Sequence, residues 1–324
     1  MKPATIVALA AALLLIAPVA YAQTYPDRPI RMVVPYTPGG AIDIVARRVT
    51  HEWIGKLGQQ IVIDNRGGAG GTIGTEMVAK APPNGYTILY GNIGPLSVGP
   101  HVYKKLGYDV FKDFAPVTIA TSSPFMLFVS TKLPVNSVKE LIAYAKERPG
   151  KLNYASSGTA SGLHLTSELF ARVAGIDIVH IPFKGIAPAV PEIAAGRVHI
   201  LTYPPSGAEP HVKSGLLKPL MIAGPRRSPH YPDVPTSIEQ GMPTFDSTAW
   251  HAILAPAGTS HPIVLKLQQT YKAAIAAPEL QKSMAAIDVE LVGSSPAELA
   301  KFLRSENDKW GTVIRAAGIK MEVN

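Results

Sequence analysis

Short apolar runs alternate with amphipathic segments between residues 30 and 90. The run Ile30–Pro35 is rich in β-branched residues, as is typical of a buried parallel strand. After Pro38-Gly39-Gly40, apolar residues recur at helical spacing on one face, namely Ile42, Val45, Val49 and Trp53, and Gly58 ends the pattern. Further strands are predicted at Ile61–Asp64 and Thr87–Tyr90, with a helix at about Thr75–Lys80 between them. This β-α-β-α-β order predicts a mostly parallel sheet flanked by helices.

Residues 125–223 repeat the alternation and predict a second sheet of the same kind. Ser137 and Glu140 form a capping box that begins a helix, and Pro149-Gly150 ends it. The expected strands are Phe125–Ser130, Asn153–Ser156, Ile178–Phe183, Val198–Tyr203 and Leu217–Ala223, and the other expected helices are Leu163–Val173 and Pro188–Ala195.

Two amphipathic helices follow in the C-terminal part, and no long linker separates the two halves. Val264, Leu267, Tyr271 and Ile275 mark the buried face of the first, and Leu299, Phe302, Leu303, Trp310 and Ile314 that of the second. The second begins with a capping box, Ser295-Pro296-x-Glu298. We therefore expect two lobes joined by two crossing strands, Phe125–Ser130 and Trp250–Pro256. The first lobe would hold residues 23–124 and 251–324, and the second residues 125–250.

The N-terminus has the layout of a secretory signal peptide. Lys2 precedes an apolar run over residues 5–19, and Ala20-Tyr21-Ala22 offers a small-x-small cleavage site before Gln23. A membrane anchor is the competing interpretation, but the run is shorter than the ~20 residues that span a bilayer. The sequence therefore predicts a signal peptide over residues 1–22 and a mature protein exported to the periplasm.

Composition excludes several classes of protein. The chain has no cysteine, which rules out disulfides, thiolate metal sites and cysteine nucleophiles. The net charge of +8, less Lys2, leaves +7 on the mature chain, and its basic residues are dispersed. A nucleic-acid partner is therefore not expected, since such proteins gather their basic residues in patches.

Searches for catalytic and cofactor motifs fail. There is no Gly-x-Ser-x-Gly elbow and no His-Glu-x-x-His, and no two of the nine histidines have metal-ligand spacing. Gly67–Gly71 resembles a dinucleotide-binding loop only in its glycine content. We expect no metal and no cofactor.

Two loops at strand ends remain as candidate chemistry. Tyr36–Asp43 follows the first strand, and Ser156–Ser161 follows a strand of the second half. Both are rich in glycine and hydroxyl residues and both lead into a helix, where free N–H groups and the helix dipole favour an anion such as a carboxylate. The alternative is that they are ordinary caps and turns, with Asp43 and Thr159 satisfying helix donors.

The ordered motifs of the whole mature chain resemble the receptors of tripartite tricarboxylate transporters, the Bug family of periplasmic solute-binding proteins. They are Tyr25–Ile30, Val34–Gly40 with Asp43, Val62–Gly71 with Gly74, Lys112–Val117, Ser157–Ser161 with His164-Leu165, Pro182–Gly185 and Leu254–Thr259. The resemblance implies a type II periplasmic-binding-protein fold whose lobes close on a small organic carboxylate. It also implies membrane transporter subunits as partners, and we expect a monomer.

The resemblance also implies which residues bind the ligand. The first lobe offers Tyr36, Thr37, Gly39, Gly40, Ala41, Asp43 and Asn92, and the second offers Ser157, Gly158, Thr159, Ser161, His164, Lys184, Gly185 and Tyr203. For His164 a structural role is an equal alternative.

The chain departs from the family pattern in two places. After Gly196 the family usually has an acidic residue and often an Asp or Asn a few residues later, where this chain has His199 and Tyr203. After the tryptophan that matches Trp250 the family tends to have glycine, where this chain has His251. If Tyr203 or His251 reaches the cleft, the pocket differs from that of amino-acid-binding members, and an aromatic or differently charged ligand is favoured. An exported sensor of the same solute remains an alternative function, and an exported hydrolase of small esters is a further one.

Overall fold

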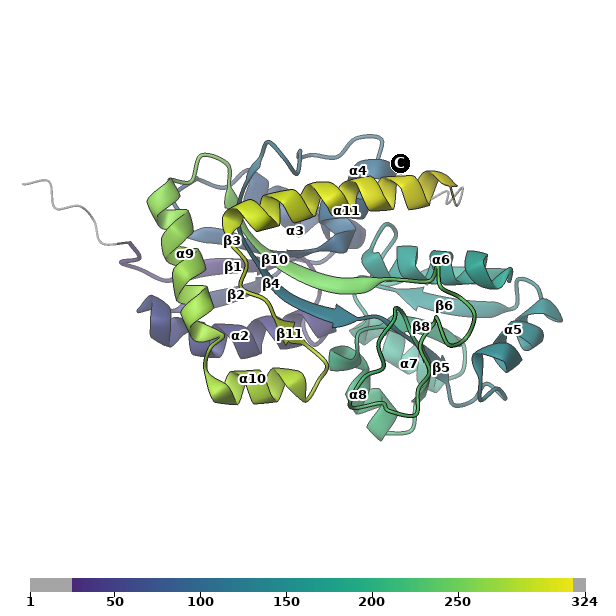
Figure 1. The fold of residues 1–324 in the computed structure, drawn as a ribbon. Coiled ribbons are helices and arrows are strands. Elements are labelled where there is room, and N and C mark those ends of the chain that lie inside the picture. The colour runs from purple at the N-terminus through teal and green to yellow at the C-terminus, as the bar shows by residue number, and fades with distance from the viewer. Residues whose placement is uncertain (1–24, 317–324) are drawn as a thin grey trace, which may run out of the picture.

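The computed structural model describes residues 25–316, so the signal peptide predicted over residues 1–22 lies outside the described part. The chain forms two sheets, each flanked by helices (Figure 1). We call the six-stranded sheet with its helices the first lobe, and the five-stranded sheet with its helices the second lobe. None of the helices described is long and apolar enough to cross a membrane.

The first sheet has the strand order β11-β4-β10-β3-β1-β2. Its strands are β1 (Ile30–Val34), β2 (Ile61–Asn65), β3 (Thr87–Asn92), β4 (Phe114–Pro124), β10 (Thr248–Pro256) and β11 (Glu290–Leu291). The helices of this lobe are α2 (Ala41–Leu57), α3 (Thr72–Ala79), α4 (Gly99–Val102), α9 (His261–Ala274), α10 (Pro278–Ala285) and α11 (Pro296–Ala316). β1 pairs in parallel with β2 and β3, as predicted, whereas β10 is antiparallel to both β3 and β4.

The second sheet has the order β7-β6-β8-β5-β9. Its strands are β5 (Met126–Ser130), β6 (Leu152–Ser156), β7 (Ile178–Pro182), β8 (Ile200–Tyr203) and β9 (Leu217–Ile222). Its helices are α5 (Val138–Lys146), α6 (Gly162–Ala174), α7 (Val190–Ala194) and α8 (Pro205–Lys213). β6 is parallel to β7 and β8, but β5 is antiparallel to β8 and β9. Both sheets are therefore mixed, because the chain crosses between them once in each direction.

The two crossings differ from the predicted ones. β5 belongs wholly to the second sheet and β10 wholly to the first. The outward crossing falls at Phe125, between β4 and β5, and the return crossing reaches β10 through Ser247. The two crossings touch, since the Phe125 N–H donates to the Ser247 carbonyl at 3.3 Å. The division of the chain at residues 124/125 and 250/251 remains a prediction.

The sequence pattern did not predict strand β4 or helices α8 and α10. β4 contains Pro116 and Pro124 together with several polar residues, and this composition is more typical of a loop than of a strand. Pro116 is tolerated because β11 pairs with β4 only at Thr121 and Ser122, so that β4 has a single neighbour, β10, at the proline. In Figure 1, β4 and β10 run side by side from the first lobe toward the second.

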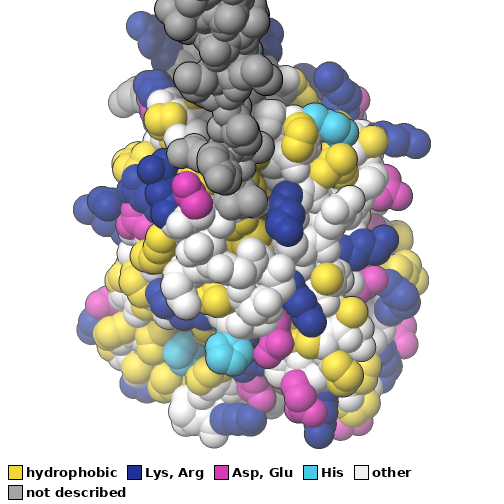
Figure 2. All heavy atoms as spheres, turned by 90° about the vertical axis from the view of Figure 1, so that its left-hand side faces the viewer, with side chains coloured by type: hydrophobic (Ala, Val, Ile, Leu, Met, Phe, Trp, Pro, Cys, Tyr) yellow, Lys and Arg dark blue, Asp and Glu magenta, His cyan; other side chains and the backbone are white. Residues whose placement is uncertain are grey.

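One face of the molecule shows how its basic residues are distributed. On the face shown in Figure 2, Lys and Arg side chains are scattered among acidic and apolar ones. The part of this face that the described residues form shows no continuous basic stripe of the kind that binds nucleic acid.

Helix α11 is fixed to the first sheet by a buried carboxylate. The indole nitrogens of Trp250 and Trp310 donate to the same oxygen of Glu306, at 2.8 and 2.9 Å. Trp250 lies on β10 and Trp310 on α11, and both indoles are buried. One side chain therefore satisfies two N–H groups that have no access to water.

We expect Glu306→Leu to lower the free energy of unfolding by about 2–5 kcal/mol, because two buried N–H groups lose their acceptor. Glu306→Gln retains a carbonyl acceptor and is the matched control, with a smaller loss. Urea denaturation of the two variants measures the difference. Equal stability of the two would contradict the role of Glu306 as the shared acceptor.

Candidate functional site

The loop between β1 and α2 is shaped by Asp43. Its carboxylate accepts hydrogen bonds from the Gly39 N–H at 2.9 Å, from Arg47 at 3.0 Å and from the Asn65 amide at 3.0 Å. The pKa of Asp43 is lowered, since these hydrogen bonds outweigh the opposing effect of burial. All three donors come from the protein itself. Asp43 therefore maintains the loop, and a role for it in ligand binding stays a prediction.

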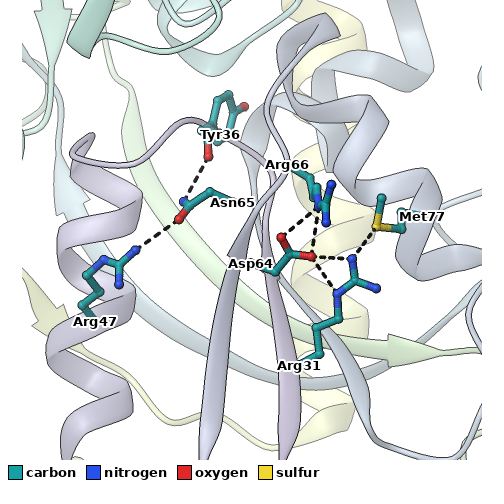
Figure 3. A network of polar contacts seen from close by, with 7 residues as sticks. All are labelled: Arg31, Tyr36, Arg47, Asp64, Asn65, Arg66 and Met77. Atoms are coloured by element: carbon teal, nitrogen blue, oxygen red, sulfur yellow. Dashed lines mark hydrogen bonds and ion pairs between the residues drawn. The ribbon is translucent and has the colours of Figure 1, made fainter.

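Neighbouring side chains brace the same loop from strand β2. Figure 3 shows Asn65 between Tyr36 and Arg47, with the Asn65 amide donating to the Tyr36 carbonyl at 3.1 Å. Beside it, Asp64 accepts hydrogen bonds from Arg31 and Arg66. The ends of β1 and β2 are thus held rigidly where the site begins.

The glycine-rich loop Gly67–Gly71 brings the two lobes into contact. A Cβ placed on Gly70 would lie 2.3 Å from the Thr159 carbonyl oxygen, so no side chain fits there. Gly70 also has a φ of 63°, in the left-handed region. Its carbonyl accepts a hydrogen bond from the Tyr36 hydroxyl at 2.8 Å. The glycines therefore allow the backbones of the two lobes to approach closely, and they do not form a phosphate-binding loop.

A second loop, Ser157–Ser161, meets this contact from the other lobe. Ser161 is the N-cap of α6, and its hydroxyl accepts a hydrogen bond from the His164 N–H at 3.3 Å. The Nδ1 atom of His164 accepts a hydrogen bond from the Ala160 N–H at 3.2 Å. Both side chains are thus occupied in capping, which is the alternative that the sequence left open for this loop.

A pocket lies between the lobes, beneath these loops. It holds about 480 Å³ of space, its open mouth included. Eight predicted residues line it, namely Tyr36, Thr37, Gly40, Ala41, Asn92, Ser157, Gly185 and Tyr203. His251, whose position the sequence left open, also lines it.

Seven predicted residues do not line the pocket: Gly39, Asp43, Gly158, Thr159, Ser161, His164 and Lys184. Gly39 and Lys184 are exposed, and Thr159 contributes its carbonyl to the contact with Gly70. His164 instead stacks on His180, with 3.7 Å between ring centroids. These seven stay predictions as ligand-binding residues.

The sequence reasoning missed most of the apolar wall. The pocket is also lined by Ile42, Ile93, Phe125, Leu163, Ile186, Pro204, Ala249 and Trp250. Ile42 and Leu163 lie in the first turn of α2 and α6, so the predicted loop-to-helix boundaries could have indicated them. Phe125 and Trp250 come from the two crossings, whose meeting is visible only in three dimensions.

Hydrogen-bonding groups from both lobes converge on the pocket. The Tyr36 hydroxyl also donates to the Asn92 side-chain oxygen at 3.1 Å. From the second lobe, the Tyr203 hydroxyl accepts a hydrogen bond from the Ala41 N–H, the first of helix α2, at 2.7 Å. Burial raises the pKa of Tyr203 to about 12, so the hydroxyl stays neutral. The Thr37 hydroxyl oxygen is buried and has no hydrogen-bond partner among the described residues.

His251 enters the pocket as a neutral side chain. Its ring stacks on Tyr90 at 5.2 Å, and its Nδ1 lies 2.8 Å from the Thr121 hydroxyl. Burial lowers its pKa to about 3. His251 pairs directly with Asn92 across β10 and β3, so the two side chains share one face of the sheet.

A serine–histidine pair exists, but it is not at the pocket. The Ser156 hydroxyl lies 2.6 Å from Nε2 of His180. Ser156 is fully buried, and its hydroxyl also exchanges hydrogen bonds with Gly158 at 3.1 Å. A nucleophile must reach its substrate, so this pair stabilises the loop and does not support ester hydrolysis. Among residues 25–316, no group of three or more acidic or histidine side chains is placed to hold a metal ion.

We expect Gly70→Ala to push the two lobes apart, because its Cβ collides with Thr159 and its φ is unfavourable for alanine. Small-angle scattering should show a larger radius of gyration. Gly55→Ala is the matched control, since a Cβ at that position of α2 meets nothing within 4 Å. Identical scattering by the folded Gly70→Ala variant and wild type would refute a backbone contact that keeps the lobes together.

The stacked histidines predict acid sensitivity. Burial lowers the pKa of His164 to about 3 and that of His180 to about 4, while Tyr154 and Glu168 are the titratable groups beside His164. An unfolded histidine titrates near 6.5, so the unfolded state binds more protons below that pH. Stability should be fully present above pH 6.5 and decline toward pH 4, by up to about 1.4 kcal/mol per pH unit for each histidine.

Thermal melting between pH 4 and 8 measures this effect on the wild type and on His180→Gln. The variant should lose less stability on acidification. His51→Gln, at an exposed position of α2, serves as the control and should follow the wild type. A wild-type melting temperature that stays constant from pH 8 to pH 4.5 would rule out the buried neutral pair.

Comparison with known proteins identifies the family to which this architecture belongs. A family model described as the tripartite tricarboxylate transporter family receptor matches residues 45–319. Protein BugT of Bordetella pertussis is 37% identical over 302 residues, which cover 93% of this chain and 93% of BugT.

Solved structures agree in fold. The periplasmic binding protein BugD superposes with a TM-score of 0.88 at 33% identity, over 92% of this chain and 100% of that one. A Rhodopseudomonas palustris protein with adipate gives 0.87 at 36% identity, over 91% and 99% of the two chains. MatC of the same organism, with bound malate, gives 0.86 at 33% identity, over 90% and 100%. The two-lobed α/β fold expected from the motifs is therefore confirmed, and the chain belongs to the tripartite tricarboxylate transporter receptor family, the Bug-type periplasmic binding proteins.

Proposed function

We propose that this chain is an exported receptor that captures a small organic carboxylate between its lobes and delivers it to the membrane subunits of a tripartite transporter. It would act as a monomer in the periplasm after removal of residues 1–22. The observation that carries the proposal is the buried, unpartnered hydroxyl of Thr37 in a pocket lined by both lobes. Relatives that hold adipate and malate support the same class of ligand.

The unpartnered hydroxyl matters because a buried polar atom without a hydrogen bond is costly. The Thr37 side chain is enclosed by the second lobe, since a Cβ on Gly185 would lie only 2.0 Å from its oxygen. A ligand oxygen in the pocket would complete its hydrogen bonding. The unpartnered hydroxyl therefore lowers the stability of the free protein, and ligand binding removes this penalty.

Other donors surround this position. The Asn92 side-chain oxygen accepts from Tyr36, which leaves the Asn92 amide NH2 as a donor for a ligand. Ser157 adds a hydroxyl from the second lobe, and the N-terminus of α2 adds its dipole. Neutral donors of this kind bind a carboxylate through charge-assisted hydrogen bonds.

Binding by loops of both lobes would also favour the closed form. A ligand shifts a conformational equilibrium only through contacts that one state has and the other lacks. Contacts to Thr37 and Ser157 together require the two lobes to be close. Closure would present the membrane subunits with a shape that only the loaded receptor adopts.

Thr37→Val should weaken carboxylate binding about tenfold to a hundredfold, since it removes one charge-assisted hydrogen bond. It should slightly raise the stability of the free protein, because a buried hydroxyl without a partner is replaced by an apolar group. Thr37→Ser keeps the hydroxyl and is the matched control. Calorimetry with a carboxylate and its neutral amide measures both effects, and equal affinity for acid and amide would contradict the proposed function.

A further inference from the structure

The imidazole of His251 lies between two polar side chains on one face of the first sheet. His251 of β10 pairs with Asn92 of β3 on one side and with Thr121 of β4 on the other. Side chains directly opposite each other on neighbouring strands share a face, with Cβ atoms about 4.5–5.5 Å apart. His251 and Asn92 also line the pocket. The hydrogen bonds of this ring therefore bear on what the pocket can bind.

Two hydroxyl groups behind the ring determine which of its nitrogens carries the proton. The Tyr90 side chain is fully buried, and the partner of its hydroxyl among the described residues is the Thr121 hydroxyl, 3.3 Å away. Burial raises the pKa of Tyr90, so its hydroxyl keeps its proton and donates a hydrogen bond to Thr121. The Thr121 hydroxyl then donates to Nδ1 of His251, 2.8 Å away. Only this arrangement gives both buried hydroxyl protons an acceptor.

Nε2 of His251 carries the proton of the ring and is left without a partner. Burial lowers the pKa of His251 to about 3, so the ring is neutral, and its one proton lies on Nε2 because Nδ1 accepts. The two nitrogens of an imidazole point in diverging directions, so Nε2 is turned away from Thr121. Within residues 25–316, only Nδ1 of this ring is hydrogen-bonded. His251 therefore brings an unused N–H donor to the lining of the pocket.

This N–H differs from the hydroxyl groups of the same pocket. The hydroxyls of Ser157 and Tyr203 can turn either a proton or a lone pair toward a ligand, whereas Nε2–H can only donate. The described residues that line the pocket include no Asp, Glu, Lys or Arg. An ammonium group of a ligand would find no carboxylate there, and beside His251 it would face another donor. A ligand oxygen beside His251 would instead accept a hydrogen bond.

We propose that His251 is a specificity-determining residue that donates a hydrogen bond from Nε2 to an oxygen of a second polar group on the bound carboxylate. The inference rests on the proposed function and narrows its ligand class. A second carboxylate suits this donor, because the hydrogen bond is then charge-assisted. The receptor therefore favours diacids over ω-amino acids of the same chain length.

Calorimetry at pH 7.5 with two matched sets of acids tests this preference: adipate, hexanoate and 6-aminohexanoate, and succinate, butyrate and 4-aminobutyrate. In at least one set the diacid should bind at least about tenfold more tightly than the amino acid. A smaller difference in both sets would overturn the inference and leave the carboxylate receptor standing. No binding by any of the six acids, or equal binding of hexanoate and hexanamide, would overturn the proposed function and the inference with it.

Two variants separate the donor from the ring that carries it. His251→Phe retains an aromatic ring to stack on Tyr90 but removes Nε2–H, and it should weaken diacid binding about tenfold to a hundredfold relative to the monoacid. His251→Gln is the matched control, because its amide nitrogen can donate in place of Nε2, and it should keep most of the wild-type ratio. Circular dichroism checks that both variants fold. An equal loss of diacid and monoacid binding in folded His251→Phe would contradict a role in specificity.

Nitrogen NMR tests the tautomer on the wild-type protein. At pH 7.5 the His251 ring, assigned by the loss of its signals in His251→Gln, should show a protonated Nε2 and an unprotonated Nδ1. The diacid that binds more tightly should shift the Nε2–H resonance. A proton on Nδ1 would make Nε2 an acceptor, and this result would overturn the inference.

Discussion

Backbones of the two lobes touch at Gly70 and Thr159 with no room for a side chain, and the site depends on this contact. It sets the distance between the loop after β1 and the loop before α6. The Tyr36 hydroxyl reaches the Gly70 carbonyl, and the Tyr203 hydroxyl reaches the first N–H of α2. The pocket is thus bounded by hydrogen bonds within and between the lobes. Its volume depends on how closely the glycine loop allows the two lobes to approach each other.

Electrostatic neutrality is the second constraint on the site. Asp43, the acidic residue nearest in sequence, is fully engaged in shaping the loop, and His251 is neutral. Hydroxyl and amide dipoles recognise an anion with a smaller desolvation cost than a buried lysine or arginine would incur. Such a site can hold a negative charge without a charged side chain beside it.

The sequence was a good guide to the fold and a partial one to the site. Periodicity predicted β1, α2 and α6 almost residue for residue, because their apolar faces follow the buried side of each element. It failed at β4, whose prolines are tolerated for a reason that depends on strand order.

For the site, the loop after β1 was identified through its glycines, whereas Ser161 and His164, predicted as ligand-binding, cap helix α6 and the loop before it. A hydroxyl at a helix start can cap the helix or face a ligand, and only the fold decides which. Trp250 and Phe125 were predicted only as the first residues of the crossing strands, since their place in the pocket results from the meeting of the two crossings.

A crystal structure of the protein with bound benzoate would test the central claim, that an interlobe site built of neutral donors receives a carboxylate. One carboxylate oxygen should lie within hydrogen-bonding distance of the Thr37 hydroxyl, with the ring against Leu163 and Trp250. Benzoate seated with its ring toward Thr37 and its carboxylate on the apolar wall, or bound outside the interlobe pocket, would contradict the account.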